Sequence, residues 1–122
     1  MTALYHGGVR RLHVGSVLLP PVKTGAASQA DFGNHVARRD RVYVTTERDQ
    51  AELFALLAPP DGNGDLYEVE PIGDLEIDPD YHGPGASYAV PMAHVVRVVR
   101  RRVTDFNGVT AAEALALIAS TP

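Results

Sequence analysis

The amino-acid sequence predicts a strand-dominated α+β fold, and three observations support this class. Segments rich in β-branched and aromatic residues, such as 41–45 and 93–103, are typical of strands. Two further segments, which begin near Thr46 and Thr110, carry helix start signals and apolar residues at helical spacing. The strands and helices do not alternate regularly along the chain, so we do not expect a doubly wound parallel sheet.

Length and composition indicate one globular domain. The chain has 122 residues, so we expect residues 1–122 to share one hydrophobic core. Hydrophobic residues make up 45% of the chain and charged residues 21%, which is ordinary globular usage. The absence of cysteine excludes a disulfide scaffold, a thiolate metal site and a cysteine nucleophile.

Charge and hydropathy exclude several partners. The formal net charge is −4, so the molecule lacks the overall basic charge expected of a nucleic-acid-binding protein. No apolar run approaches the ~18 residues that a membrane span needs. Polar residues such as His6, Arg10 and His13 interrupt the N-terminal segment too early for a signal peptide. We therefore expect a cytoplasmic protein without a membrane partner.

The first third of the chain predicts strands separated by one long loop. Residues 3–6 read as a short strand, and 14–21 as a turn with an apolar segment that two prolines end. Residues 22–40 lack periodicity and are rich in small and polar residues. A loop of that length in a small domain is either functional or disordered. The alternating segment 41–45 predicts the next strand.

Residues 46–60 predict a helix. Thr46 is the expected N-cap, and Asp49 completes a weak capping box three residues later. Two prolines, Pro59 and Pro60, end the helical pattern. The apolar stripe consists of Ala51, Leu53, Phe54, Leu57 and Ala58.

The second half of the chain predicts mainly strands. A turn at 61–65 precedes a strand at 66–72, which ends near Pro71. Residues 73–88 are mostly loop with a short strand around 75–77, and 93–103 form a long valine-rich strand.

The C-terminal segment predicts a turn and a helix. Asn107-Gly108 turns the chain, and Thr110 with Glu113 forms a capping box that opens the last helix.

Three residues are candidates for chemistry, and each also has a purely structural interpretation. His6 ends an apolar segment before two glycines, where a solvated or core histidine is common. Tyr43 lies in a strand, where tyrosine usually belongs to the core. Asp78 precedes Pro79, where aspartate usually stabilises a turn. Spacing alone does not favour the functional interpretation for any of them.

Other sites are poorly supported. Asp78, Asp80 and His82 alternate and could hold a divalent ion, but no second histidine or calcium loop accompanies them, so we expect no metal. The glycines in "GNG" and "GPG" lack the strand-to-helix context of a phosphate loop. No serine lies in a nucleophile elbow.

A basic run ends the long valine-rich strand. It consists of Arg97, Arg100, Arg101 and Arg102. Charges that protect an exposed edge strand explain it best, with a local phosphate or nucleic-acid contact as the alternative.

The order of the motifs resembles the small rifampin ADP-ribosyltransferase family. The pieces are "LYHGG", "LHVGSVLLPP", "DRVYVTTERDQAELFA", "GDLYEVEPIGDLEIDPD", "SY" and "VVRVVRRRV", which together span residues 4 to about 103. The resemblance implies a split α+β fold with two small, roughly perpendicular β-sheets, a cleft for NAD and two helices.

The resemblance also implies the site. His6, Tyr43 and Asp78 match a His-Tyr-Asp catalytic triad, and NAD is the implied co-substrate. The implied NAD contacts are His6, Gly7, Tyr43, Thr45, Phe54, Ser87 and Tyr88. Phe54 lies eleven residues after Tyr43 and would add a second ring to the nicotinamide pocket. The two glycines after His6 would let the dinucleotide lie close to the backbone.

The implied reaction is transfer of ADP-ribose to a hydroxyl or similar acceptor, with a small molecule favoured and a rifamycin-type compound as one candidate. Asp78 would stabilise positive charge on the ribose, Tyr43 would stack on nicotinamide, and His6 would position the adenosine half. Three alternatives stay open: modification of a protein or nucleic acid, RNA 2′-phosphotransfer, and a non-catalytic nucleotide-binding module.

Overall fold

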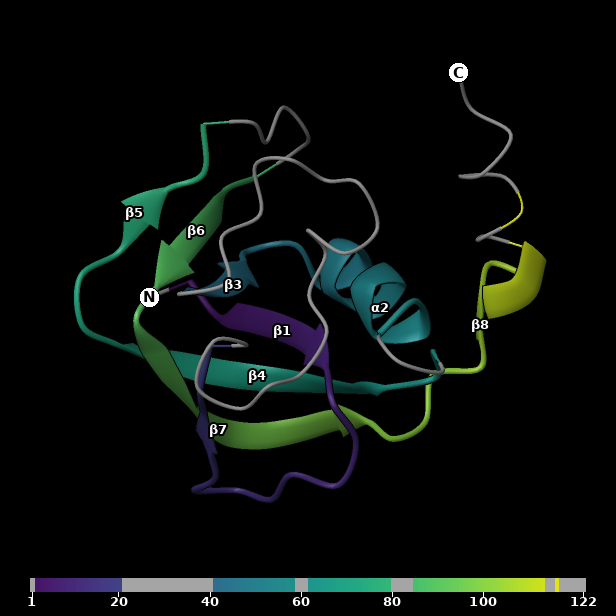
Figure 1. Cartoon of the computed structure of the whole chain (residues 1–122), viewed down its shortest axis with the longest axis horizontal. Helices are drawn as coiled ribbons and strands as arrows, with labels where there is room; N and C mark the ends of the chain where they lie inside the picture. The colour runs from purple at the N-terminus through teal and green to yellow at the C-terminus, as the bar shows by residue number, and fades with distance from the viewer. Residues whose placement is uncertain (1, 21–40, 59–61, 80–84, 114–115, 117–122) are drawn as a thin grey trace.

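A computed structural model describes residues 2–20, 41–58, 62–79, 85–113 and 116, and it confirms the α+β class (Figure 1). Within these ranges the chain forms an antiparallel seven-stranded sheet, a two-stranded sheet and two helical segments. None of the described helices is long and apolar enough to cross a membrane. The predicted loop at 22–40 lies outside the described residues.

The large sheet is built from strands that are far apart in sequence. Its strands are β1 (Leu4–Gly8), β2 (Val17–Leu18), β3 (Val42–Thr45), β4 (Asp65–Ile72), β5 (Glu76–Ile77), β6 (Ser87–Val90) and β7 (Met92–Arg100). They lie in the order β2-β7-β4-β1-β3-β6-β5. Helix α2 (Arg48–Leu56) follows β3, and β8 (Asp105–Phe106) pairs with β9 (Val109–Thr110) in the small sheet.

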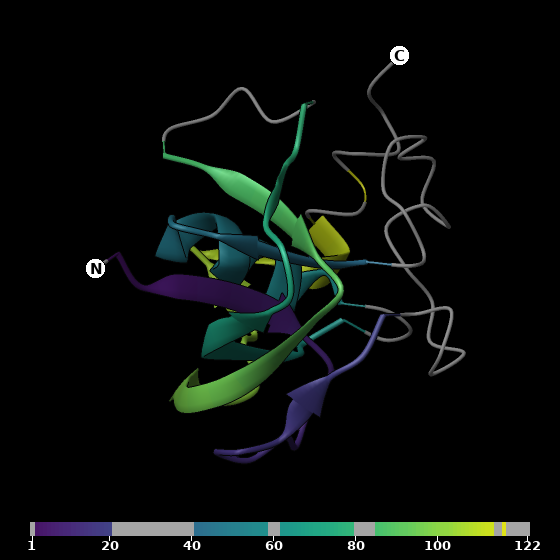
Figure 2. The same ribbon diagram turned by 90° about the vertical axis from the view of Figure 1, so that its left-hand side faces the viewer.

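The large sheet is split between β1 and β3. Strand β1 makes five register pairs with β4 but only one, Tyr5↔Thr45, with β3. In Figure 1, β6 runs steeply across the direction of β1 and β4, and Figure 2 shows the two halves from the side. The sheet thus consists of a half with β2, β7, β4 and β1 and a half with β3, β6 and β5, joined at one residue pair.

Alternation along the strands produces a core on each face of the sheet. On one face, Val42 and Val44 of β3 pack with a cluster that also contains Leu18, Tyr67, Val69, Val90, Ala93 and Val95. On the other face, Ala51 and Ala55 of α2 pack with Leu56, Leu66 and Val103, and Tyr5 packs against this cluster. The pleat therefore determines which residues of β1 and β3 meet α2.

The predicted helix exists, but its predicted cap is wrong. Helix α2 begins at Arg48 with Glu47 as the N-cap, and no side chain makes a capping hydrogen bond there. The hydroxyl of Thr46 instead contacts Ala86 and Glu47. Contacts with Ala86, just before β6, thus replace the local cap that the sequence predicts.

Two predictions for the second half of the chain also need correction. The long strand ends at Arg100 rather than at 103, because Arg102 adopts a positive φ of 49° and the chain bends. Ser87 and Tyr88, which the sequence predicts to belong to a loop, lie in strand β6.

The C-terminal turn and cap are confirmed. Asn107 and Gly108 have φ values of 51° and 81° and join β8 to β9, as a tight hairpin turn requires. The amide of Glu113 donates to the Thr110 hydroxyl at 3.3 Å, where the last helical segment begins.

Candidate functional site

The two glycines at the end of β1 are required by packing on opposite sides of the strand. A Cβ at Gly7 would overlap the carbonyl oxygen of Ala51, so helix α2 lies directly on the Gly7 backbone. A Cβ at Gly8 would lie 2.5 Å from Nε2 of His6, so the imidazole occupies that space. These contacts explain both glycines, and the NAD contact expected at Gly7 stays a prediction.

The His6 ring lies at the split between β1 and β3. Its Nδ1 is 2.8 Å from the backbone carbonyl oxygen of Tyr43. A carbonyl can only accept a hydrogen bond, so Nδ1 carries the proton and Nε2 of the neutral ring has a free lone pair. Burial lowers the pKa of His6 below its ordinary value of 6.5, and the hydrogen bond to Tyr43 opposes this shift only in part.

A row of polar side chains crosses the smaller half of the sheet. Tyr5 opposes Thr45, and Thr45 opposes Ser87. Directly opposed residues share a face, and Tyr43 shares it too because it lies two residues before Thr45. This is the face on which α2 packs, since Tyr5 contacts the cluster of Ala51 and Ala55.

Asp78 continues this row. Its amide donates to the carbonyl oxygen of Ser87 at 3.0 Å, one residue beyond the register pair Ile77↔Tyr88. Asp78 therefore opposes Ser87 at the end of the short ladder between β5 and β6 and lies on the same face as Tyr43. In the sequence the two residues are 35 positions apart, and the sheet order brings them to two strands that are separated only by β6.

The His6 side chain is not part of this row. It lies where the two halves of the sheet separate, between β1 and β3. Alternation places its side chain on the other side of the pleat from Tyr5, and the ring then contacts the Tyr43 backbone. The structure thus joins the His6 ring to the Tyr43 main chain and places Tyr43 and Asp78 on one face of the sheet. Convergence of all three side chains on one ligand stays a prediction.

Phe54 lies on the side of α2 that faces β3. Glu52 contacts Arg100 of β7, on the opposite side of β1 from β3. Phe54 follows Glu52 by two residues, or about 200° around the helix, so its ring points the other way. It is half-buried and belongs to neither of the two core clusters of the described residues.

The remaining expected ligand contacts have structural partners. Thr45 is buried, and its hydroxyl donates to the Ala86 carbonyl at 3.1 Å and accepts from the Glu47 amide at 3.0 Å. Tyr88 opposes Val44 and packs on the cluster of the opposite face. Ser87 is buried next to Thr45. Ligand contacts by these residues stay predictions.

The interpretation of the basic run as protection of an exposed edge stays a prediction. Strand β7 lies between β2 and β4, but among the described strands β2 pairs only with Ala93 and His94 of β7, before the basic run begins. Three of the four arginines form ion pairs within the molecule. Their partners are Glu68 for Arg97, Glu52 and Asp105 for Arg100, and Asp65 for Arg101, while the Arg102 amide donates to Asp65.

No group of three metal-ligating side chains occurs in the described part of the chain, and Asp80 and His82 lie outside it.

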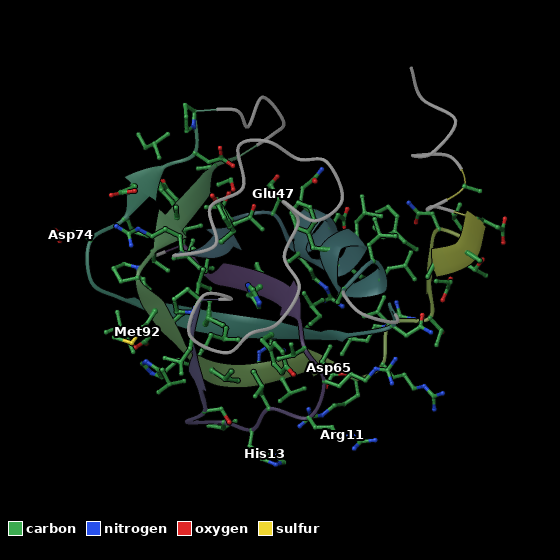
Figure 3. All side chains as sticks on the ribbon, in the orientation of Figure 1. Arg11, His13, Glu47, Asp65, Asp74 and Met92 are labelled. Carbon is green, nitrogen blue, oxygen red and sulfur yellow. The ribbon has the colours of Figure 1, made fainter. Side chains whose placement is uncertain are left out.

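One group of residues at this site carries no local signal in the sequence. Thr46, Glu47 and Gly85 lie against one another where β3 leads into α2, and Figure 3 labels Glu47 of this group. They come from positions about 40 apart in the sequence, so no local pattern indicates the contact.

Comparison with known proteins adds one finding. Residues 4–101 match the protein-family model described as rifampin ADP-ribosyl transferase. This range includes β1 to β7 and all three candidate catalytic residues. No curated protein matches the chain.

Proposed function

Since the chain belongs to the rifampin ADP-ribosyl transferase family, we propose that it transfers ADP-ribose from NAD to a hydroxyl group of a small-molecule acceptor. The observation that carries the proposal is the family match over residues 4–101, a range that contains His6, Tyr43 and Asp78. The local structure around each of these residues suits the role proposed for it.

His6 is proposed to hold the adenosine ribose. Its Nδ1–H is committed to the Tyr43 carbonyl, which fixes the ring and leaves Nε2 as an acceptor. A ribose hydroxyl is a donor that matches this lone pair. Because burial lowers the pKa of His6, the acceptor form persists at neutral pH.

Tyr43 and Phe54 are proposed to hold the nicotinamide. Tyr43 lies on the face of the sheet that α2 covers. Helical periodicity from the Glu52–Arg100 contact puts Phe54 on the side of α2 away from β7 and toward β3. Stacking on an aromatic ring contributes about 1 kcal/mol beyond the burial of apolar area. The side chain of His6 and that of Tyr43 lie on different sides of the pleat. Such an arrangement suits NAD, because its two nucleosides need separate contacts.

Asp78 is proposed to act on the ribose that is transferred. NAD supplies a nicotinamide leaving group, and positive charge develops on the ribose as that bond breaks. The Asp78 carboxylate would accept from the ribose 2′-hydroxyl and stabilise this charge. Its amide is tied to Ser87, so the side chain projects from a hydrogen-bonded strand end rather than from a free loop.

The acceptor hydroxyl would then attack the ribose directly. The mechanism needs no covalent enzyme intermediate, which agrees with a chain that contains no cysteine and no serine elbow. A rifamycin-type acceptor is proposed because the family description names rifampin.

The proposal is tested by identifying the product. Purified protein is incubated with NAD and a panel of acceptors that includes a rifamycin, a basic protein and an RNA oligonucleotide, and each acceptor is examined by mass spectrometry. We expect one ADP-ribosyl group on the small molecule. Modification of the protein or RNA alone would contradict the small-molecule acceptor, and unmodified acceptors throughout would contradict the transferase activity.

A further inference from the structure

The backbone of Ala86 is held by Thr45, the last residue of β3, and by Thr46, which follows it. The Thr46 amide donates to the Ala86 carbonyl at 2.9 Å, and the Ala86 amide donates to the Thr46 hydroxyl at 2.8 Å. The Thr45 hydroxyl donates to the same carbonyl at 3.1 Å. Residue 86 is thus fixed through both its amide and its carbonyl oxygen.

These contacts lead directly to Asp78. Ala86 precedes Ser87, and the Ser87 carbonyl accepts the hydrogen bond of the Asp78 amide at 3.0 Å. Strand β5 has only two residues, so its own ladder with β6 is short. The position of the Asp78 backbone therefore depends on how firmly Ser87 is held, and the Thr46–Ala86 contacts hold it from the adjacent residue.

Gly85 completes the contact. It has a positive φ of 70°, and a Cβ there would overlap the Thr46 hydroxyl and approach Cδ of Glu47 to 2.7 Å. The chain can pass this close to Thr46 only without a side chain at residue 85.

The Thr46 hydroxyl does not serve the helix that follows it. The N-cap of α2 is Glu47, and that terminus has no side-chain capping bond. The role of Thr46 thus lies in the contact between β3 and the residues before β6.

We infer that Thr46 is a positioning residue for Asp78: its hydroxyl fixes Ala86, and through Ser87 it fixes the carboxylate proposed to stabilise the ribose. The inference rests on the proposed function for its catalytic consequence. Loss of the hydroxyl should impair the chemical step, where placement within about 1 Å matters, more than the binding of NAD.

The direct test compares Thr46→Val, which keeps the shape and removes the hydroxyl, with Thr46→Ser, which keeps the hydroxyl. We expect kcat for nicotinamide release to fall on the order of 10-fold or more in Thr46→Val, with KM for NAD little changed. Thr46→Ser should retain most of the activity. Thr110→Val, which removes the hydroxyl that caps the last helix, is the matched control and should leave kcat unchanged.

A second variant disturbs the contact between Thr46 and Ala86 by a change at Gly85. Gly85→Ala should lower kcat in the same way, because the added methyl group displaces the Thr46 hydroxyl. Gly108→Ala introduces an alanine at a similar φ of 81° with nothing within 4 Å, so it controls for backbone strain alone.

Amide hydrogen exchange measured by NMR separates the inference from the proposed function. We expect the Asp78 amide to exchange faster in Thr46→Val than in the wild type, with the buried amides of β4 unchanged. Unchanged exchange at Asp78, full kcat in Thr46→Val, or an equal loss in Thr46→Ser would overturn the inference while the transferase activity stands. A wild-type protein that releases no nicotinamide would instead overturn the proposed function, and the catalytic role of Thr46 with it.

Discussion

At the scale of single residues, His6 shows how the backbone sets the chemistry of a side chain. The Tyr43 carbonyl selects the tautomer in which Nδ1 is protonated, and Gly8 leaves the space that the ring occupies. Burial lowers the pKa of the ring, so the neutral form is retained below pH 6.5. Each of these contacts keeps Nε2 available as an acceptor.

The first prediction concerns pH. Protonation of Nε2 would remove the acceptor, so KM for NAD should stay constant as pH falls to 6.5 and rise only at lower pH, below the ordinary pKa of histidine. Because the unfolded chain takes up this proton first, His6 should also cost stability as pH falls below 6.5 toward the lowered pKa. KM and the unfolding free energy measured against pH test both statements.

His13→Gln alters an exposed imidazole and is the control for this pH series. A rise in KM that begins well above pH 6.5, or that persists unchanged in His6→Asn, would contradict the assignment of the acceptor to His6.

The candidate residues themselves could be selected from the sequence only through their order along the chain. Spacing alone did not distinguish Asp78 from an ordinary turn residue before Pro79. Its alignment with Ser87 and Thr45 depends on strand pairing across the sheet, which no local pattern encodes. The tautomer of His6 likewise depends on a carbonyl 37 residues away.

At the scale of elements, strand β1 and helix α2 contact each other through their backbones at Gly7. Ala51 and Ala55 of the helix face Gly7, so the two backbones lie against each other. Small residues at such positions allow close approach of the elements. This contact sets the position of α2, and with it the position of Phe54 relative to β3.

The second prediction compares the two glycines. Gly7→Ala places a methyl group on the helix backbone, which cannot move without displacing α2, so we expect a loss of about 3 kcal/mol or more in unfolding free energy. Gly8→Ala meets only the movable His6 ring and should cost about 1 kcal/mol while raising KM for NAD. Urea denaturation and NAD kinetics measure the two effects.

An equal loss of stability in both variants would show that Gly8 also packs against the backbone. An unchanged KM in a folded Gly8→Ala protein would show that the His6 ring does not need its present orientation.

Local sequence signals predicted a turn or a cap correctly where no distant residue competes for the same groups. The Asn-Gly turn and the Thr110 cap formed as predicted, because both depend on residues within four positions. The Thr46 cap did not form, because its hydroxyl has partners at residue 86 that replace the helix amide. Strand β6 was missed because its short, mixed sequence gains its stability from pairing with β3 and β5.

At the scale of the whole molecule, the buried carboxylate of Asp65 links three segments by hydrogen bonds: its own strand β4, the residues after β1 and the residues after β7. Asp65 accepts hydrogen bonds from the amides of Arg11 and Arg102 and from the guanidinium of Arg101, and its carboxylate lies 3.3 Å from the hydroxyl oxygen of Tyr67. Burial would raise the pKa of this carboxyl, but its hydrogen bonds and the Arg101 charge together lower it. Burial raises the pKa of Tyr67 to about 12, so this phenol stays protonated and donates to the carbonyl of Val9.

The third prediction follows from this network. Asp65→Asn removes the charge and replaces an acceptor oxygen with an NH₂ group that faces donors, so we expect a loss of about 3 kcal/mol in unfolding free energy. Asp105→Asn, which alters a half-exposed partner of Arg100, should cost less than about 1 kcal/mol. Chemical denaturation at neutral pH compares the two.

The pH dependence of stability adds a check on the same carboxylate. Because the pKa of Asp65 is lowered, its stabilising effect is complete above its ordinary value of 3.8 and is lost as pH falls through the lowered pKa. A similar cost for both asparagine variants, or an acid transition that Asp65→Asn leaves unaltered, would contradict the structural role given to Asp65.

Nicotinamide release from NAD tests the central proposal most directly. We measure it with a rifamycin acceptor in the wild type and in Asp78→Asn, after checking by circular dichroism that the variant is folded. Asparagine retains the shape but lacks the charge that offsets the developing positive ribose. The account therefore predicts release by the wild type and a kcat lower by a factor on the order of 10² in the variant, with little change in KM for NAD. Equal release by both proteins, or none by the wild type, would contradict it.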